Sequence, residues 1–571
     1  MDYNRKLTGK LIIFLFIFST GLFLAKAFIS SEISLEDEMH YIATALRFYN
    51  GDAYLVDDWS PEQLNSFLLL PFVYLFEQIF HSSDGIVIYF RILHLFFKLI
   101  IVVYSLYRLK VTNKFTACSF IGILFYYFFT PYNIEALSYN TIPLSMMFLI
   151  GIIMITSNNH KGDYYLCGVL LAFSVLSQPF IAILYFSGII SYCGYIVYVR
   201  FTHKNKNFHL ILSGKNFIIF TIGICTVAAA FLFFVFSRAN LYEILSNVIY
   251  IFNEPDHNVS TNISNTLLNK LTMVLNTFFS FCQGRITFIN ILCLCAIILS
   301  KRKKNIIIPF LLSIISLLIS CMNIILSENA FIMNAIYIPF VWFSFEALIM
   351  VNKNKLLHTV IWTACCIYTI STSLGTNTGI LSTSASMCSF AIFSMLTVSD
   401  LEISSFRPKY MTPVFQIAVL GIFIGILLLT FIMRLCIVWT DTYDKKTYSC
   451  YLSKGPLKGT VTSENVYKQY NAILETLDAI ECQDSDILFC GTSTPTAYLY
   501  LNIEFGTMGT PFFYLDYNRL ESYFTLHPDK LPTIIYYECL SGTSDENNFL
   551  YSIRNTYHVI KDDTQFLAVR Y

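Results

Sequence analysis

The feature that most constrains this chain is a series of apolar runs, each close to the twenty or so residues that an α-helix needs to cross a bilayer. The first run covers Leu11–Ile29, the last begins near Pro413, and about 13 can be recognised in all. Only 13% of the residues are charged, about half the share of a soluble domain. The sequence therefore predicts a polytopic all-α membrane protein of about 13 transmembrane helices. Its formal net charge of zero gives no general attraction for nucleic acid.

The basic residues between the runs predict an orientation. The N-terminal Arg5 and Lys6 and the cluster Lys301–Lys304 are expected on one side, while the loops expected on the other side carry few basic residues. By the positive-inside rule, the N-terminus is cytoplasmic in a multi-pass plasma-membrane protein. This assignment requires the apolar segment Gln63–Phe80 to lie along the membrane surface, with Ser60 as its cap and Pro61 at its first helical position.

Two domains follow from the change in composition after the last run. Residues 1–440 form the transmembrane module, which includes a first outer loop at 30–84 and a long outer loop at 237–285. Residues 441–571 are richer in charge, proline and glycine, which predicts a small extracytoplasmic α/β domain. Its expected strands and helices alternate, with strands at Ile487–Cys490, Pro511–Leu515, Thr533–Tyr537 and Gln565–Val569, and helices at Glu464–Ile480, Arg519–Leu526 and Asn547–Arg554.

The first outer loop opens with three consecutive acids, Glu36, Asp37 and Glu38. One interpretation is structural, because Ser34 and Asp37 fit a capping box and acids favour the first turn of a helix. The other is functional, because carboxylates beside a membrane segment are costly to bury. The local pattern alone leaves both open.

The first loop also resembles that of the GT-C glycosyltransferases, in the branch of protein O-mannosyltransferases and lipid A aminoarabinose transferases. The matching residues are Asp37-Glu38, Tyr41, the Gly51-Asp52 turn and Arg91 at the start of the second run. The resemblance implies a membrane glycosyltransferase that moves a sugar from a polyprenyl-phosphate donor to an extracytoplasmic acceptor, such as a cell-envelope glycan, lipid or protein. The absence of a Gly-rich nucleotide-phosphate motif is consistent with a lipid-linked donor.

The resemblance also implies catalytic roles. Asp37 is expected to be the base for the acceptor or the group that positions it, because an attacking hydroxyl must lose its proton. Glu38 is the second catalytic candidate, or else it holds the loop. Tyr41, one turn from Asp37 on the same helical face, and Asp58 are expected to bind substrate, although an interfacial aromatic and a helix-start acid explain them too.

The chain departs from the family before the surface helix. Related enzymes often carry Lys-Pro-Pro there, whereas this sequence reads Ser60-Pro61-Glu62-Gln63. Either Gln63 contacts the substrate differently, or the lipid phosphate is bound by Arg91, Arg285 or Arg238. Arginine at the end of a span also lies there for structural reasons.

The long outer loop contains possible metal ligands. Glu254, Asp256 and His257 offer oxygen and imidazole donors that could hold a divalent metal ion against a phosphate. A solvated turn around Pro255 is the alternative.

Two other functions remain open. A surface-polysaccharide polymerase or ligase would more often use basic residues in two outer loops, which are scarce here. A transporter or flippase would place charges within its spans, of which Lys98 is the clearest.

Overall fold

The computed structural model describes most of the chain. The residues outside the description are 1, 31–35, 203–213, 253–267, 270–271, 273–274, 277–283, 303–306, 327–331, 352–353, 375–379, 401–411, 439–440, 443–447, 484, 492–494, 511–516, 539–555, 563–564 and 571. The side chains of several helical residues, including Glu36, Asp37 and Arg285, also lie outside it.

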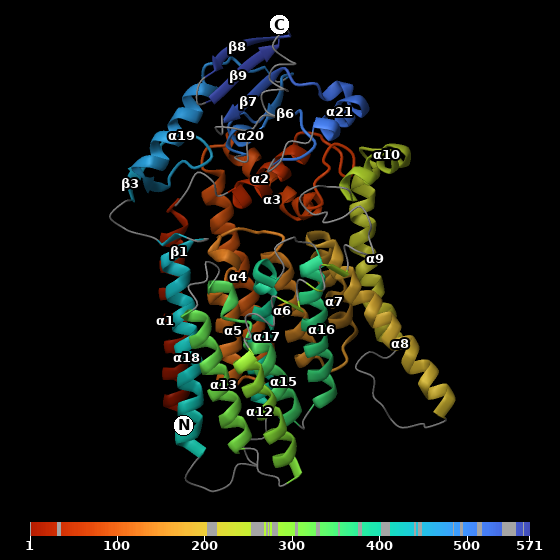
Figure 1. The fold of residues 1–571 in the computed structure, drawn as a ribbon, viewed down its shortest axis with the longest axis vertical. Coiled ribbons are helices and arrows are strands. Elements are labelled where there is room, and N and C mark those ends of the chain that lie inside the picture. Colours follow the sequence, from red (N-terminus) through yellow and green to blue (C-terminus); the bar gives the residue numbers. More distant parts are fainter. Residues whose placement is uncertain are drawn as a thin grey trace.

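Long helices form a bundle below a smaller mixed α/β region, with the first-loop helices between the two (Figure 1). Among the described residues, four helices are long and apolar enough to cross a membrane, and shorter apolar helices accompany them. The chain is therefore a membrane protein. The count of about 13 spans and the orientation remain predictions. The bundle helices are α1 (Asp2–Ala27), α4 (Ile86–Val111), α5 (Ala117–Phe128), α6 (Thr141–Thr156), α7 (Lys161–Ser177), α8 (Ala182–Thr202), α9 (Gly214–Phe236), α12 (Gly284–Arg302), α13 (Ile307–Ile325), α14 (Ile332–Ala335), α15 (Phe340–Met350), α16 (Lys355–Leu374), α17 (Ile380–Ser399) and α18 (Thr412–Cys436).

Small residues allow the bundle helices to pack closely. Helices α7 and α9 meet at Gly168 and Gly223, where an added Cβ would lie 2.0 Å from the Phe220 carbonyl oxygen and 2.3 Å from that of Tyr165, respectively. Only glycine fits at such a backbone-to-backbone contact, which is typical of helix pairs in membranes.

The first loop folds into two helices at one end of the bundle. These are α2 (Glu36–Tyr49) and α3 (Ser66–Phe80), joined by an irregular segment and one 3₁₀ turn at Gln63–Asn65. The predicted start of the second helix is wrong. The α-helix begins at Ser66, Asn65 makes no side-chain cap, and the Ser60 hydroxyl accepts a hydrogen bond from the Glu62 amide within a local turn. The Gln63 side chain holds the preceding residues in place of a capped first turn.

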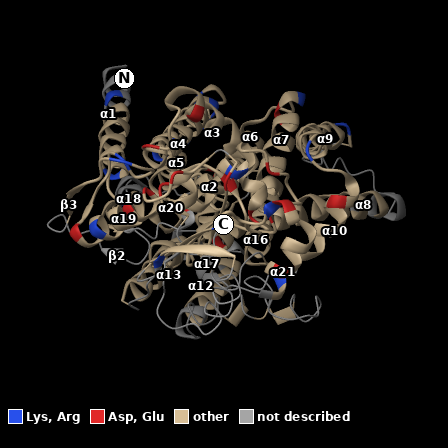
Figure 2. Cartoon of the chain, turned by 90° about the horizontal axis from the view of Figure 1, so that it is seen from above, with Lys and Arg blue, Asp and Glu red and all other residues tan. Residues whose placement is uncertain are grey.

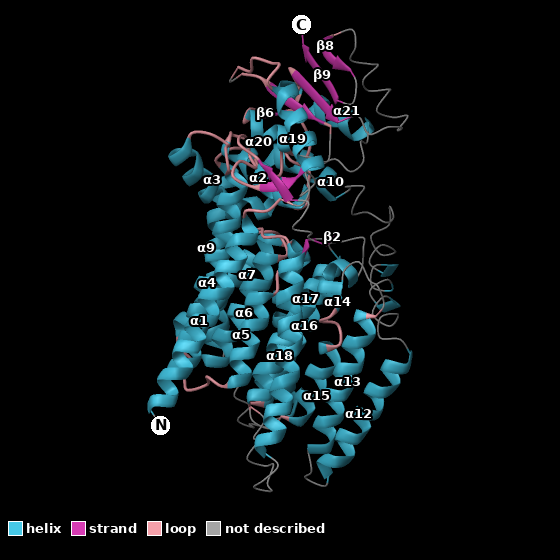
Figure 3. Cartoon of the chain, turned by 90° about the vertical axis from the view of Figure 1, so that its left-hand side faces the viewer, coloured by secondary structure: helices cyan, strands magenta, loops and turns pink. Residues whose placement is uncertain are grey.

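The C-terminal region contains a five-stranded mixed sheet with the order β6-β5-β7-β9-β8, and its strands cluster at one end of the molecule (Figure 3). Strand β5 pairs in parallel with β6 and β7, whereas β9 is antiparallel to β7 and β8. The elements are β3 (Tyr448–Tyr451), β4 (Val461–Ser463), α19 (Glu464–Leu477), β5 (Ile487–Cys490), α20 (Thr496–Leu501), β6 (Glu504–Phe505), α21 (Tyr517–Leu526), β7 (Ile534–Glu538), β8 (Tyr557–Asp562) and β9 (Gln565–Arg570), with the short pair β1 (Ile437–Val438) and β2 (Asp441–Thr442) before them.

Three of the four predicted strands are confirmed, as β5, β7 and β9, and two of the predicted helices are confirmed, as α19 and α21. The predicted strand Pro511–Leu515 and helix Asn547–Arg554 lie outside the described residues. Strands β3, β4, β6 and β8 and helix α20 are not among the predicted elements.

The α/β region is joined to both ends of the first loop. Ile29 and Val461 form a parallel β-bridge, and the Gly85 amide donates to the Gly455 carbonyl at 3.0 Å. The Asp84 carboxylate accepts hydrogen bonds from the Gly455 amide at 2.6 Å and from Lys458 at 2.9 Å. The division of the chain near residue 440 remains a prediction, but the two parts pack together through this loop.

Candidate functional site

Helix α2 presents its polar residues to two different partners. Near its start, Glu38 points toward the bundle and forms a two-pronged ion pair with Arg91 of α4. Arg91 Nε lies 2.7 Å from Glu38 Oε1, and Arg91 Nη2 lies 2.8 Å from Oε2. Arg91 Nη1 donates to the carbonyls of Ala27 and Ile29 at 2.9 Å. Both side chains are at least 97% buried, with relative exposures of 2% and 3%.

The predicted catalytic Glu38 and the predicted substrate-binding Arg91 are therefore bound to each other. A parallel arginine–carboxylate pair uses the strongest hydrogen-bonding directions of both groups. This geometry matches the alternative role of Glu38 as the residue that holds the loop. It fixes the start of α2 to α1 and α4.

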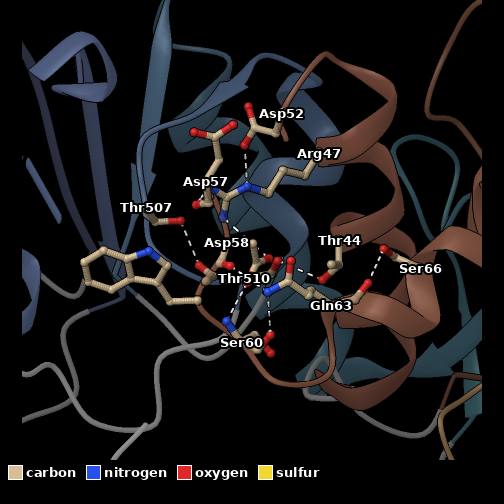
Figure 4. Close-up of polar contacts among 12 residues, drawn as sticks. Thr44, Arg47, Asp52, Asp57, Asp58, Ser60, Gln63, Ser66, Thr507 and Thr510 are labelled. Atoms are coloured by element: carbon tan, nitrogen blue, oxygen red, sulfur yellow. Dashed lines mark hydrogen bonds and ion pairs between the residues drawn. The ribbon is translucent and has the colours of Figure 1, made fainter. Parts of the chain in front are cut away.

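The other end of α2 carries a buried cluster around Arg47 (Figure 4). Arg47 Nε donates to Asp52, and Nη2 donates to the Asp57 carbonyl and, at 3.1 Å, to the hydroxyl of Tyr523. Arg47 Nη1 lies 3.6 Å from Asp58 Oδ2, too far for a hydrogen bond. Neither of these two buried atoms has a hydrogen-bond partner among the described residues. They form a donor and an acceptor side by side.

Gln63 holds the loop that carries Asp58. Its Oε1 accepts from the Leu55 amide at 2.7 Å, and its Nε2 donates to the carbonyls of Asp58 at 2.7 Å and Ser60 at 3.0 Å. Asp58 Oδ1 accepts from the Ser60 amide at 2.7 Å. Gln63 is predicted to bind substrate, but its buried side chain instead fixes the backbone of residues 55–63. The short polar side chains replace the regular hydrogen bonds that this irregular backbone lacks.

The α/β region supplies the opposite wall of this cluster. Lys530 Nζ donates to Asp52 Oδ1 at 2.5 Å and to Glu504 at 2.7 Å. Thr510 and Thr44 share a hydrogen bond of 2.9 Å, and the Trp59 amide donates to the Met508 carbonyl at 2.7 Å. We call the contact between residues 44–63 and residues 504–530 the seam. Seen from above, acidic and basic positions lie close together around α2 (Figure 2).

Burial shifts the pKa values of the seam. It raises the pKa of Asp57 to about 6, with the nearby Asp52 carboxylate adding to the effect. Burial likewise raises the pKa of Asp58, although Arg47 opposes the shift. For Lys530, burial alone would lower the pKa, but Asp52 and Asp57 raise it above its usual value. Buried carboxyls whose pKa values are raised are the kind of group found at acid–base sites.

His40 belongs to this site, although it is not among the predicted site residues. His40 lies on the same face of α2 as Thr44, and its Nδ1 is 3.3 Å from the Thr44 hydroxyl. Its Nε2 lies 3.6 Å from Glu62 Oε2. The position of His40 one helical turn after Asp37 could have indicated it. Its partner Glu62 drew attention only as part of the segment that replaces Lys-Pro-Pro. Tyr41 is buried beside it, with its ring 5.8 Å from that of Tyr139.

Five predicted site residues lie outside the description in whole or in their side chains. Asp37 and Arg285 are placed by their backbones in α2 and α12, whereas Glu254, Asp256 and His257 are not described. Helical spacing puts Asp37 on the face of α2 that carries His40, Tyr41 and Thr44. Across the described residues, three or more His, Cys, Asp or Glu side chains nowhere gather as a metal site would require.

A second buried cluster surrounds Glu135 at the end of the bundle below α2. Arg434 of α18 forms a parallel ion pair with Glu135, at 2.9 Å and 2.8 Å. His94 Nδ1 lies 3.1 Å from Glu135 Oε2, and Lys26 Nζ lies 4.0 Å from Oε1. Lys98 donates to the Phe129 carbonyl at 2.5 Å and to Thr130. These contacts join α1, α4 and α18 to the 130–135 loop.

Comparison with known proteins adds two remote likenesses. No family model matches the chain, and no curated protein matches it. The crystal structure of ArnT from Cupriavidus metallidurans bound to undecaprenyl phosphate is 10% identical, with 98% of each chain covered and a TM-score of 0.49. ArnT in the apo state is 9% identical, with 99% of this chain and 98% of that chain covered and a TM-score of 0.41.

ArnT is a lipid A aminoarabinose transferase, from the branch that the first-loop motif resembles. Because both TM-scores lie below 0.5 and the identities are near 10%, these likenesses carry no argument about the site. The geometry of the first loop has to support the assignment of function.

Proposed function

We propose that this protein is a membrane glycosyltransferase that moves a sugar from a polyprenyl-phosphate donor to an acceptor outside the cytoplasm. One observation carries the proposal. The acid-rich first loop is folded over the end of an apolar helix bundle, and its Asp52 and Asp58 carboxylates lie in a buried seam that the α/β region covers. A site at this level meets both a lipid-borne donor and a water-borne acceptor.

In the proposed reaction, Asp37 accepts the proton of the acceptor hydroxyl or amine as that group attacks the anomeric carbon. The bond between this carbon and the phosphate oxygen breaks, and the lipid phosphate leaves with the electron pair. His40 and Thr44 follow Asp37 along one face of α2, so an acceptor held there would meet all three. Asp58, with one carboxylate oxygen lacking a hydrogen-bond partner in the described part, is proposed to bind the acceptor.

The leaving phosphate requires positive charge. Arg285 is the proposed ligand, because the other candidate, Arg91, is bound to Glu38. Glu254, Asp256 and His257 are proposed to hold a divalent ion at the same phosphate. Tyr41 and Gln63 are proposed to shape the site.

The test is single-turnover transfer by the purified protein from radiolabelled polyprenyl-phosphate sugars. If Asp37 is the base, Asp37→Asn lowers the rate by roughly 10² to 10⁴, while Glu36→Gln, the matched neighbour, leaves it near the wild-type rate. Equal rates in both variants would reduce Asp37 to a helix-capping role. Failure of the wild-type protein to transfer or hydrolyse any such donor would remove the proposed function itself.

A transporter is the second candidate, and one observation favours it. Glu346 lies in the middle of α15, within a candidate membrane span, and is fully buried. Acids within membrane segments commonly line ion or substrate pathways. Uptake of a labelled substrate into proteoliposomes, abolished in Glu346→Gln and unaffected by Asp37→Asn, would replace the enzyme proposal with this one.

A further inference from the structure

Helix α10 (Leu241–Phe252) begins five residues after the end of α9, and the corner between them is anchored. Arg238 Nη1 donates to the carbonyls of Phe48 at 2.5 Å and Asp52 at 2.9 Å. The helix crosses the end of α9 at the level of α2 and α3 (Figure 1). Its position relative to the membrane helix is therefore defined by contacts with the first loop.

The side chains of α10 fall into three sectors around its axis. Four large apolar residues share one exposed arc, namely Leu241, Tyr242, Leu245 and Ile249, with exposures of 59%, 81%, 61% and 57%. Glu243 and Ser246 occupy the next arc, and Asn247 and Ile251 are buried on the third. A helix that meets apolar solvent, water and protein on three successive sides produces this division.

The buried sector of α10 joins the first loop to α21. Asn247 Oδ1 accepts from Trp59 Nε1 and lies within hydrogen-bonding distance of His527 Nε2, both at 2.9 Å. The Tyr250 ring stacks on Trp59 with centroids 4.2 Å apart. Arg519 of α21 donates to the carbonyls of both Trp59 and Tyr250. Trp59 follows Asp58 directly and belongs to the seam, so α10 contacts the seam itself.

The exposed apolar arc continues a surface that already faces lipid. Helix α9 is long and apolar enough to cross a membrane, and Phe233 and Phe236 near its end are 80% and 52% exposed. After the exposed polar residues Ser237, Arg238 and Asn240 of the corner, exposed apolar side chains resume at Leu241 and Tyr242. A second crosswise helix at the same level, α3, exposes Tyr74, Ile79 and Phe80. Two such faces at one level mark the same boundary between lipid and water.

We propose that α10 lies in the surface of the bilayer, with its exposed apolar arc among the lipid acyl chains and Glu243 and Ser246 toward water. The bilayer then also supports the seam, because it fixes helix α10, and α10 in turn contacts Trp59. The proposal does not depend on the glycosyltransferase assignment. A membrane-surface helix would fix the height of the seam for any lipid-borne substrate.

The test places single cysteines at Leu245 and at Glu243 in the full chain, labels them with a fluorophore and reconstitutes the protein in nanodiscs. Lipids carrying a quencher near the top of the acyl chain should quench the label at Leu245 at least twofold more than the label at Glu243. Equal quenching at the two positions would overturn the proposal.

Two other occupants of the arc would also overturn it. A second copy of the chain would protect Leu245 from lipid and give a dimer mass in solution. A polyprenyl chain would leave Leu245 unquenched by the bilayer and change its fluorescence only when polyprenyl phosphate is added.

Paired glutamates at Leu245 and Ile249 test the link to the seam. Both side chains are exposed, so the fold is retained, but the helix should leave the bilayer. Backbone hydrogen exchange at residues 55–60 should then rise at least tenfold. Leu531→Glu, which alters an exposed leucine of the α/β region, is the matched control and should leave this exchange unchanged. Unchanged exchange in the paired variant would contradict the link.

Discussion

Asp57 links the seam to pH. Its pKa is raised to about 6, above the usual value near 3.9, because the carboxyl is buried beside Asp52. The folded protein therefore binds this proton more tightly than the unfolded chain. The resulting stability is fully present below about pH 4 and is lost as the pH rises through about 6.

We therefore expect the free energy of unfolding of the wild type to fall relative to Asp57→Asn between pH 4 and pH 6.5. The size is roughly 2 kcal/mol, since one unit of pKa shift corresponds to about 1.4 kcal/mol. Thermal unfolding in detergent across this pH range measures it. A wild-type curve parallel to that of Asp57→Asn would show that Asp57 does not titrate in the seam.

The pair formed by Glu38 and Arg91 separates a structural role from a catalytic one. Removal of one partner leaves a buried charge uncompensated, so Arg91→Ala should cost about 3–5 kcal/mol. Arg91→Lys keeps the charge but cannot form two parallel bonds with the carboxylate. If the pair only holds the loop, the double variant Glu38→Gln/Arg91→Gln should recover the stability that either single variant loses. Any transfer activity lost in the single variants should return as well. Recovery of stability without activity would show that Glu38 or Arg91 also contacts substrate.

At the scale of elements, one glycine turn docks the α/β region on the first loop. Gly455 has a φ of 76°, and an added Cβ would lie 2.5 Å from the Tyr470 hydroxyl oxygen. Gly455→Ala should therefore destabilise the protein by about 1–2 kcal/mol from backbone strain alone, and by more if Tyr470 must move. Gly421→Ala in α18, where nothing lies within 4 Å, should be close to neutral. Equal melting temperatures for the two variants would contradict this account of the turn.

The elements that could be predicted are those whose signal is local. The apolar runs and the strands β5, β7 and β9 follow from hydropathy and alternation along the chain. The start of α3 could not be found this way, because the segment before it is held by Gln63 and not by a helix cap. The pairing of Arg91 with Glu38 joins residues 53 apart, and spacing along the sequence carries no sign of such a contact. Glu346 was detectable as an acid inside an apolar run, and was overlooked.

For the whole molecule, the first loop and the α/β region must lie on the same side of the membrane, because they share the seam. Single cysteines at Lys468 of α19 and at Lys161 of α7 test the predicted orientation, since both positions are exposed. In a variant with the native exposed cysteines replaced by serine, a membrane-impermeant maleimide added to whole cells should label position 468 and not 161. The reverse pattern would invert the topology and remove the extracytoplasmic reaction.

The seam also has a consequence for how the protein is made. Thr44 is bonded to Thr510, and Asp52 to Lys530, across 466 and 478 residues. At about 5–20 residues synthesised per second, the first loop waits on the order of half a minute or more for the partners of its charged groups. Until then the Asp52 carboxylate has Arg47 as a partner but lacks Lys530. A chain that stops before residue 504 leaves Asp52 without Lys530, so the site is completed only after the α/β region has been made.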